Sequence, residues 1–210
     1  MSVSNIITGI AGMLIPIISI GAILIAIAYY DNFDWKRNVL SNLGQREKSA
    51  QIFNNGLIIA GILAFVFAMG LFRKILQLVG PMGTSFLRKM RSTIGSMGAL
   101  SLVLAAIALT GIGLFPAVTD AYFPSVPNID IHPVMAIIFF ISLLLALSLI
   151  GTYFLLSHRR RLGIGTVLAA IIGTVILLST PLSATSQFVA SMLGSVWASV
   201  IGFMLLKRYL

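Results

Sequence analysis

The chain alternates between long apolar segments and short polar ones. Six segments contain no Asp, Glu, Lys, Arg or His, and they cover residues 6–30, 51–72, 93–115, 133–157, 164–181 and 188–206. A helix rises about 1.5 Å per residue and the hydrocarbon core of a bilayer is about 30 Å thick, so roughly 20 apolar residues span it. The pattern predicts an all-α, polytopic membrane protein, with six transmembrane helices bundled in a single domain over residues 1–210.

The last two apolar segments are separated by a short polar stretch, and the first segment begins near the N-terminus. A single helix through 164–206 would exceed the bilayer about twofold, so Pro181 and the small polar residues around it predict a tight turn between two spans. The first segment lacks a basic leader and its apolar run is too long for a signal peptide. We expect it to be retained as a span.

Composition supports a membrane protein. Hydrophobic residues make up 59% of the chain and charged residues only 9%, whereas soluble domains carry about 25% charged residues. A net charge of +9 would suggest a nucleic-acid partner in a soluble protein. Here the basic residues lie between spans, as they do in cytoplasmic loops, so no nucleic acid is expected. The absence of cysteine excludes disulfides and thiolate metal sites.

The distribution of basic residues predicts the orientation. Six spans place ten of the fourteen Lys and Arg residues on the face that carries both termini, and four on the other face. Because basic loops stay in the cytoplasm, we expect both termini to be cytoplasmic, in a cell membrane. The five carboxylates then all lie on the outer face: Asp31, Asp34, Glu47, Asp120 and Asp130.

Two connecting segments show further local patterns. In the outer loop 31–50, Trp35, Val39, Leu40 and Leu43 recur at roughly helical spacing among charged neighbours, which predicts a short amphipathic helix in the membrane interface. In the basic segment 73–92, one or two helical turns are expected before a break at Gly80-Pro81-Met82-Gly83.

Small residues in the last span predict close helix packing. Gly194, Ala198 and Gly202 are four residues apart, a spacing that lets two backbones approach closely in lipid. Trp197 lies near the middle of the same span instead of at an interface, and we expect it to fill the core or a subunit interface.

Polar residues near the outer interface are the first candidate site. Ser41-Asn42-Leu43-Gly44 suits a helix terminus or a turn, because Ser and Asn bond local backbone and Gly tolerates a positive φ. Asn54 and Asn55 fall at the outer end of the second span, where unpaired amides are costly. They bond a neighbouring helix or face a water-filled cavity, and Asn42, Asn54 and Asn55 are candidate ligand-binding residues.

His132 is the second candidate. Asp130 suits the cap of the fourth span and Pro133 its first turn, which places His132 at the outer interface. In a functional interpretation, Asp130 or Asp34 orients His132, which binds a ligand or activates Ser41 or a water molecule. In a structural interpretation, His132 bonds a loop carbonyl. Both interpretations stay open.

The residue types argue against two classes of chemistry. Zinc usually takes three or four protein ligands, and the outer face offers one histidine and scattered carboxylates without paired spacing. No metal and no cofactor are expected. Ion-coupled transporters generally keep acids or bases inside their spans, and this chain has none there.

The motifs of this outer region resemble a known family. Ser41-Asn42-Leu43-Gly44, Phe53-Asn54-Asn55-Gly56-Leu57 with Gly61, Gly113-Leu114-Phe115-Pro116 and His132-Pro133 are similar to the pattern of the domain-of-unknown-function 998 family, over roughly 6–206. Its members are predicted six-span proteins of archaea and bacteria, so the resemblance implies a six-helix bundle without an assigned activity. The family often has an acid where this chain has Asn42, which weakens any role for a carboxylate beside Ser41.

Two function classes follow. The first is a binding or accessory subunit that takes an apolar ligand, or another membrane protein, at the outer leaflet. The second is an intramembrane lipid-modifying hydrolase that uses His132 with Ser41 or a water molecule. The bilayer itself is the one partner that both classes require.

Overall fold

The computed structural model describes the chain except residues 1, 80–85, 117–130, 158 and 180–182. The described residues form six long α-helices and one short 3₁₀ helix, η1. Their bounds are α1 Val3–Ala28, η1 Leu40–Gln45, α2 Glu47–Val79, α3 Phe86–Leu114, α4 Ile131–Leu156, α5 Arg160–Ser179 and α6 Ala184–Leu206. Each of the six α-helices is long and apolar enough to cross a membrane, so the predicted all-α, six-span class is confirmed.

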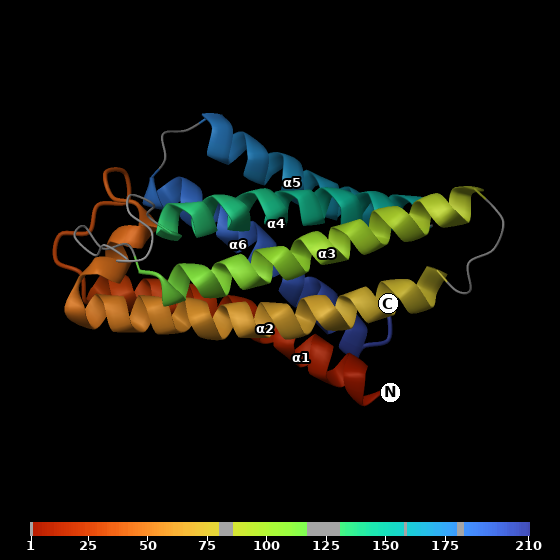
Figure 1. The fold of residues 1–210 in the computed structure, drawn as a ribbon, viewed down its shortest axis with the longest axis horizontal. Helices are drawn as coiled ribbons and strands as arrows, with labels where there is room; N and C mark the ends of the chain where they lie inside the picture. Colours follow the sequence, from red (N-terminus) through yellow and green to blue (C-terminus); the bar gives the residue numbers. More distant parts are fainter. Residues whose placement is uncertain (1, 80–85, 117–130, 158, 180–182) are drawn as a thin grey trace.

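The helices run alternately up and down, and both termini lie at the same end of the bundle (Figure 1). Each helix packs on the next one along the chain, and α6 returns to pack on α1, so the six helices form a closed ring. The contact of α5 with α6 is the sparsest of these neighbouring pairs, because α5 packs mainly on α4. Two cavities described below lie beside this loosely packed pair.

Charge separates the two ends of the ring. The end with the termini carries ten basic residues: Arg73, Lys74, Arg88, Lys89, Arg91, Arg159, Arg160, Arg161, Lys207 and Arg208. The opposite end carries the described acids Asp31, Asp34 and Glu47, while Asp120 and Asp130 lie outside the described residues. We call these the basic end and the acidic end.

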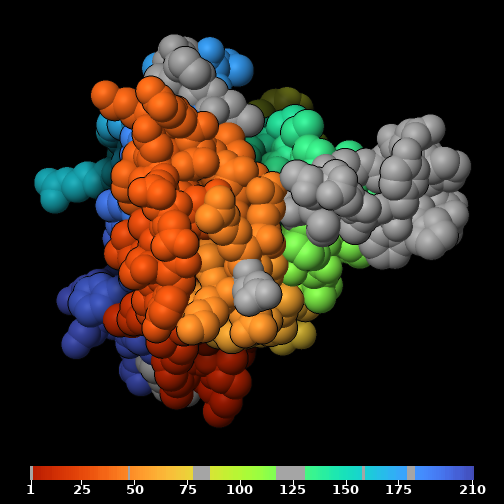
Figure 2. Space-filling view, turned by 90° about the vertical axis from the view of Figure 1, so that its left-hand side faces the viewer, coloured from red at the N-terminus to blue at the C-terminus, as the bar shows by residue number. Residues whose placement is uncertain are grey.

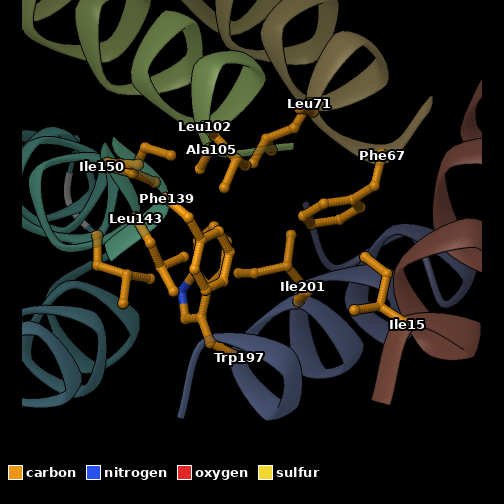
Figure 3. Close-up of a cluster of buried hydrophobic side chains, with 14 of the residues drawn as sticks. Ile15, Phe67, Leu71, Leu102, Ala105, Phe139, Leu143, Ile150, Trp197 and Ile201 are labelled. Carbon is orange, nitrogen blue, oxygen red and sulfur yellow. The ribbon is translucent and has the colours of Figure 1, made fainter. Parts of the chain in front are cut away.

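The core of the bundle is aromatic and aliphatic, with side chains converging from several helices (Figure 3). Trp197 of α6 is 7% exposed, and its ring meets that of Phe67 of α2 edge to face, with centroids 6.0 Å apart. The expectation that Trp197 fills core space is therefore confirmed. Ile15, Leu102 and Phe139 bring α1, α3 and α4 into the same cluster.

Small residues bring α1 and α6 into backbone contact. A Cβ added to Gly12 would lie 2.8 Å from the Ala198 carbonyl oxygen, and one added to Gly202 would lie 2.6 Å from the Gly9 carbonyl oxygen. No larger side chain fits at these positions without moving a helix. The small residues of the last span therefore pack inside this bundle, as their spacing predicts.

The outer loop differs from its prediction. No α-helix forms between Ala28 and Glu47; the loop is irregular up to η1, where Leu40 and Leu43 are buried. The helical spacing of apolar residues arose because this segment turns its apolar side chains onto the ends of the surrounding helices instead of into lipid. At the basic end, α2 continues to Val79, so the expected turns after residue 72 are an extension of the span.

Candidate functional site

The loop 31–46 covers the acidic end because the start of α6 holds it there. The backbone N–H of Ala184 donates to the Asn38 carbonyl at 2.6 Å. Thr185 donates its backbone N–H and its hydroxyl to the Trp35 carbonyl, at 3.2 and 2.9 Å. These N–H groups belong to the first turn of α6, and the N–H groups of a first turn have no acceptor within their own helix. The loop therefore completes the end of α6 while α6 positions the loop.

A side chain of α6 adds a third connection. The Gln187 Oε1 atom accepts the backbone N–H of Leu40 at 2.8 Å, which anchors the first residue of η1. Tyr30, Phe33, Trp35 and Phe188 continue the contact as a row of edge-to-face rings with centroids 5.3–5.5 Å apart. Figure 2 looks onto this end, where the loop and the adjoining ends of α1 and α2 form much of the facing surface.

Asp34 has a local role in this loop. One carboxylate oxygen accepts the backbone N–H groups of Lys36 and Arg37, at 2.8 and 3.3 Å, and the other lies 3.7 Å from the Arg37 Nε atom. The backbone hydrogen bond from Lys36, then the one from Arg37 and the positive charges of both residues, hold the pKa of Asp34 below its ordinary value of 3.8. Asp34 lies in an exposed turn and does not line the cavity that His132 lines.

The three candidate asparagines lie in three environments. The Asn42 Oδ1 atom accepts the backbone N–H of Val39 at 2.9 Å, so Asn42 caps the start of η1. Asn54 donates to the Gly44 carbonyl at 3.4 Å, and its buried Oδ1 atom has no hydrogen-bond partner among the described residues. Asn55 points outward and is exposed. None of the three lines the cavity described below.

His132 is buried at the start of α4. The residue is 6% exposed, and its Nδ1 atom lies 2.8 Å from the carbonyl oxygen of Phe115, just beyond α3. Because a carbonyl only accepts, Nδ1 donates in this contact, which selects the tautomer whose lone pair is on Nε2. Pro133 occupies the first turn of α4, as predicted, where a missing N–H breaks no helical bond. Asp130, its predicted neighbour, lies outside the described residues.

The contact with Phe115 bears on both interpretations of His132. It is the loop-carbonyl bond of the structural interpretation. It also fixes the tautomer whose Nε2 lone pair a general base needs, which is the requirement of the functional interpretation.

A cavity of about 410 Å³ lies below the loop, and both Ser41 and His132 line it. Most of its wall is apolar, with side chains from η1 and from all six α-helices, among them Ile23, Leu57, Ile112, Phe140 and Leu177. Its size falls in the range of pockets for small molecules, about 300–1,000 Å³. An apolar wall with a few polar groups suits a ligand with an apolar body and a polar end.

The polar groups of the cavity come from four elements. Ser41 comes from η1 and His132 from α4, and no hydrogen bond among the described residues involves the Ser41 hydroxyl. Further polar residues come from two helices that the sequence analysis did not single out for chemistry: Ser19 of α1, and Gln187, Ser191 and Ser195 of α6. The signal for Gln187 was present in the sequence, since it is the one amide next to the last span.

The rest of the described chain offers no metal site. No group of three or more His, Asp or Glu side chains lies close enough to hold an ion within the residues that the structure describes.

These features define a multi-pass membrane protein: six apolar helices of spanning length, charged residues in the loops and at the helix ends, and a largely apolar cavity at one end of the bundle. The chain belongs to the family described as protein of unknown function (DUF998), whose model matches residues 13–204. No curated protein and no solved structure matches the chain.

Proposed function

We propose that this protein binds one lipid-like molecule in the cavity at its acidic end, with the polar end of that molecule against Ser41 and His132. The observation that carries this proposal is the cavity itself, which combines an apolar wall with a hydroxyl and an imidazole at one end. In the same proposal the acidic end is extracytoplasmic, because four basic residues flank it against ten at the other end.

The geometry of the polar groups favours a neutral ligand with hydrogen-bonding groups, such as a glyceride or a quinone-like molecule. The described wall holds no Lys, Arg, Asp or Glu that would pair with a charged headgroup. A hydroxyl and an imidazole both donate and accept, so they fit ester, alcohol or carbonyl oxygens.

A pair of matched substitutions tests the binding role. Ala136 lines the cavity, whereas Ala28 is exposed at the last residue of α1 at the same end. Native mass spectrometry with added 1-oleoylglycerol should find one molecule on the wild type and on Ala28→Trp, and at least tenfold weaker binding on Ala136→Trp. Equal binding by all three proteins would refute the cavity as the site.

A second candidate, hydrolysis of the bound lipid, is favoured by one specific observation. Ser41 and His132 line the same cavity, and the Phe115 contact leaves the His132 lone pair on Nε2. In this mechanism Nε2 takes the proton of Ser41 or of a water molecule as the oxygen attacks the ester carbonyl. The imidazolium then returns a proton to the departing alcohol. Where Ser41 is the nucleophile, a water molecule that gives its proton to Nε2 next hydrolyses the acyl–Ser41 ester, which releases the fatty acid and restores the Ser41 hydroxyl.

The variant His132→Asn separates the two candidates. An Asn amide can still donate to the Phe115 carbonyl, so the α3–α4 contact is kept, but it has no basic nitrogen. A hydrolase would release oleate from 1-oleoylglycerol in the wild type and lose this activity in His132→Asn. A binding protein releases no oleate in either form, and its affinity changes by about tenfold or less, the range of one hydrogen bond. Oleate release that survives His132→Asn would exclude this mechanism.

A further inference from the structure

A second cavity lies between α5 and α6, toward the basic end. Its volume is about 370 Å³, and it shares no lining residue with the cavity at the acidic end. The walls are apolar, with Leu162 and Ala169 from α5 and Val189, Met192 and Val196 from α6. This groove follows the sparsely packed α5–α6 pair, so it is a consequence of how the ring of helices closes.

The polar groups of Trp197 and Thr166, which line the groove, are hydrogen-bonded. The Trp197 Nε1 atom donates to the Thr166 hydroxyl at 3.0 Å, and that hydroxyl donates to the Leu162 carbonyl at 2.8 Å. Because these groups satisfy one another, the indole and the methyl group of Thr166 present an apolar surface. Such a surface accepts a hydrocarbon chain without leaving a polar group desolvated.

One glycine leaves room beside the α5 backbone. A Cβ added to Gly165 would meet nothing within 4 Å, and Gly165 lines the groove. Gly163 behaves differently, because a Cβ there would lie 2.7 Å from the Leu155 backbone nitrogen, so α4 requires that glycine. No contact with the described residues requires Gly165, and its missing side chain widens the groove.

Arg161 stands at the mouth of the groove. It is exposed in the first turn of α5 and lines the cavity. Its end of the molecule holds ten basic residues, while the described aspartates, Asp31 and Asp34, lie at the opposite end. Within the part of the chain that the structure describes, Arg161 forms no ion pair. A guanidinium at the level of the headgroups binds phosphate through two parallel hydrogen bonds.

We propose that this groove holds one anionic phospholipid from the leaflet at the basic end, with its phosphate on Arg161 and one acyl chain lying against Gly165 and Trp197. The groove has the right extent, because the eight residue steps from Arg161 to Ala169 correspond to about 12 Å at 1.5 Å per residue. Half of the hydrocarbon core is about 15 Å thick. The chain of such a lipid thus runs along the groove over most of its own leaflet.

Native mass spectrometry tests the headgroup contact. Phosphatidylglycerol and phosphatidylcholine with identical chains are added to the purified protein. The wild type should retain one phosphatidylglycerol at least tenfold more tightly than phosphatidylcholine, and Arg161→Ala should remove this preference. Arg88→Ala is the matched control, because Arg88 is an exposed basic residue at the same end on α3, outside the groove. Equal losses in both variants would mean a diffuse charge effect and overturn the proposal.

Substitutions at Gly165 test the acyl-chain contact. Gly165→Phe fills the groove and should weaken phosphatidylglycerol retention at least tenfold, whereas Gly165→Ala fits the free space and should change it less than threefold. Both variants keep Arg161, so unchanged retention in Gly165→Phe would overturn the placement of the chain. Glycerol phosphate, which has the headgroup charge without chains, should not compete; competition would indicate a simple phosphate site and refute a lipid site.

Fluorescence provides a readout that does not depend on extraction. In a Trp35→Phe background, Trp197 is the one tryptophan, because the chain has two. Brominated phosphatidylglycerol should quench it more strongly than brominated phosphatidylcholine at equal mole fraction, and Arg161→Ala should abolish the difference. Equal quenching by the two lipids in the Trp35→Phe protein would show ordinary bilayer contact and reject a specific site.

Discussion

At the scale of single residues, one hydrogen bond gives His132 both its place and its tautomer. The bond to the Phe115 carbonyl ties α4 to the end of α3, and it leaves the lone pair on Nε2. The sequence identified His132, because it is the one histidine outside an arginine run, but could not show which interactions it makes. Asn42 and Asp34 make only local contacts of this kind, since each accepts hydrogen bonds from the backbone of its own loop.

Asp34 makes the outer loop sensitive to acid. Its folded-state pKa is held below the ordinary value, so its contribution to loop stability is fully present above pH 3.8 and is lost as the pH falls through the folded pKa. We expect the emission of Trp35, measured in a Trp197→Phe background, to change as the loop loosens below that pH.

The substitution Asp34→Asn should remove most of this transition. Asp31→Asn takes away the same charge three residues earlier, in an exposed position without the backbone bonds of Asp34, and should leave the transition in place. If Asp31→Asn removes the transition and Asp34→Asn does not, the backbone bonds of Asp34 are not its cause.

At the scale of helices, glycine positions decide how closely the spans pack. A Cβ added to Gly56 of α2 would lie 2.1 Å from the Ala22 Cβ atom of α1, so this contact exists only because residue 56 has no side chain. A Cβ added to Gly21, one residue before Ala22, would meet no atom within 4 Å. The sequence shows both glycines within apolar segments, and periodicity alone does not tell the required glycine from the dispensable one.

These two glycines should respond to alanine in opposite directions. Gly56→Ala forces α1 and α2 apart and should lower the free energy of unfolding by about 1–3 kcal/mol, the usual cost of overpacking. Gly21→Ala adds no clash and should raise it by about 1 kcal/mol or less, because alanine is the better helix former. Unfolding in detergent, followed by circular dichroism, measures both. A stabilised Gly56→Ala protein would contradict the close α1–α2 contact.

At the scale of the whole molecule, hydropathy and spacing predicted the part of the structure that the bilayer dictates. Apolar length predicts the six helices, since a spanning backbone must satisfy its own hydrogen bonds. The docking of the loop onto α6 was missed, because it depends on backbone bonds such as Ala184 N–H to Asn38 carbonyl, between residues far apart in sequence. For the same reason the sequence predicted Ser41 and His132 near the outer surface but not the cavity between them.

The orientation of the bundle is the last prediction, and it governs which leaflet each cavity meets. The chain has no cysteine, so single-cysteine variants can be labelled without background. Gln45 just precedes α2 and Gln77 lies in its last turns; both are exposed and neutral, at opposite ends of one helix. The excess of basic residues at the end that holds Gln77 predicts that this end lies in the cytoplasm. In intact cells, an impermeant maleimide should therefore label Gln45→Cys, and should label Gln77→Cys only after lysis. The reverse pattern would invert the topology and assign the Ser41–His132 cavity to the cytoplasmic leaflet.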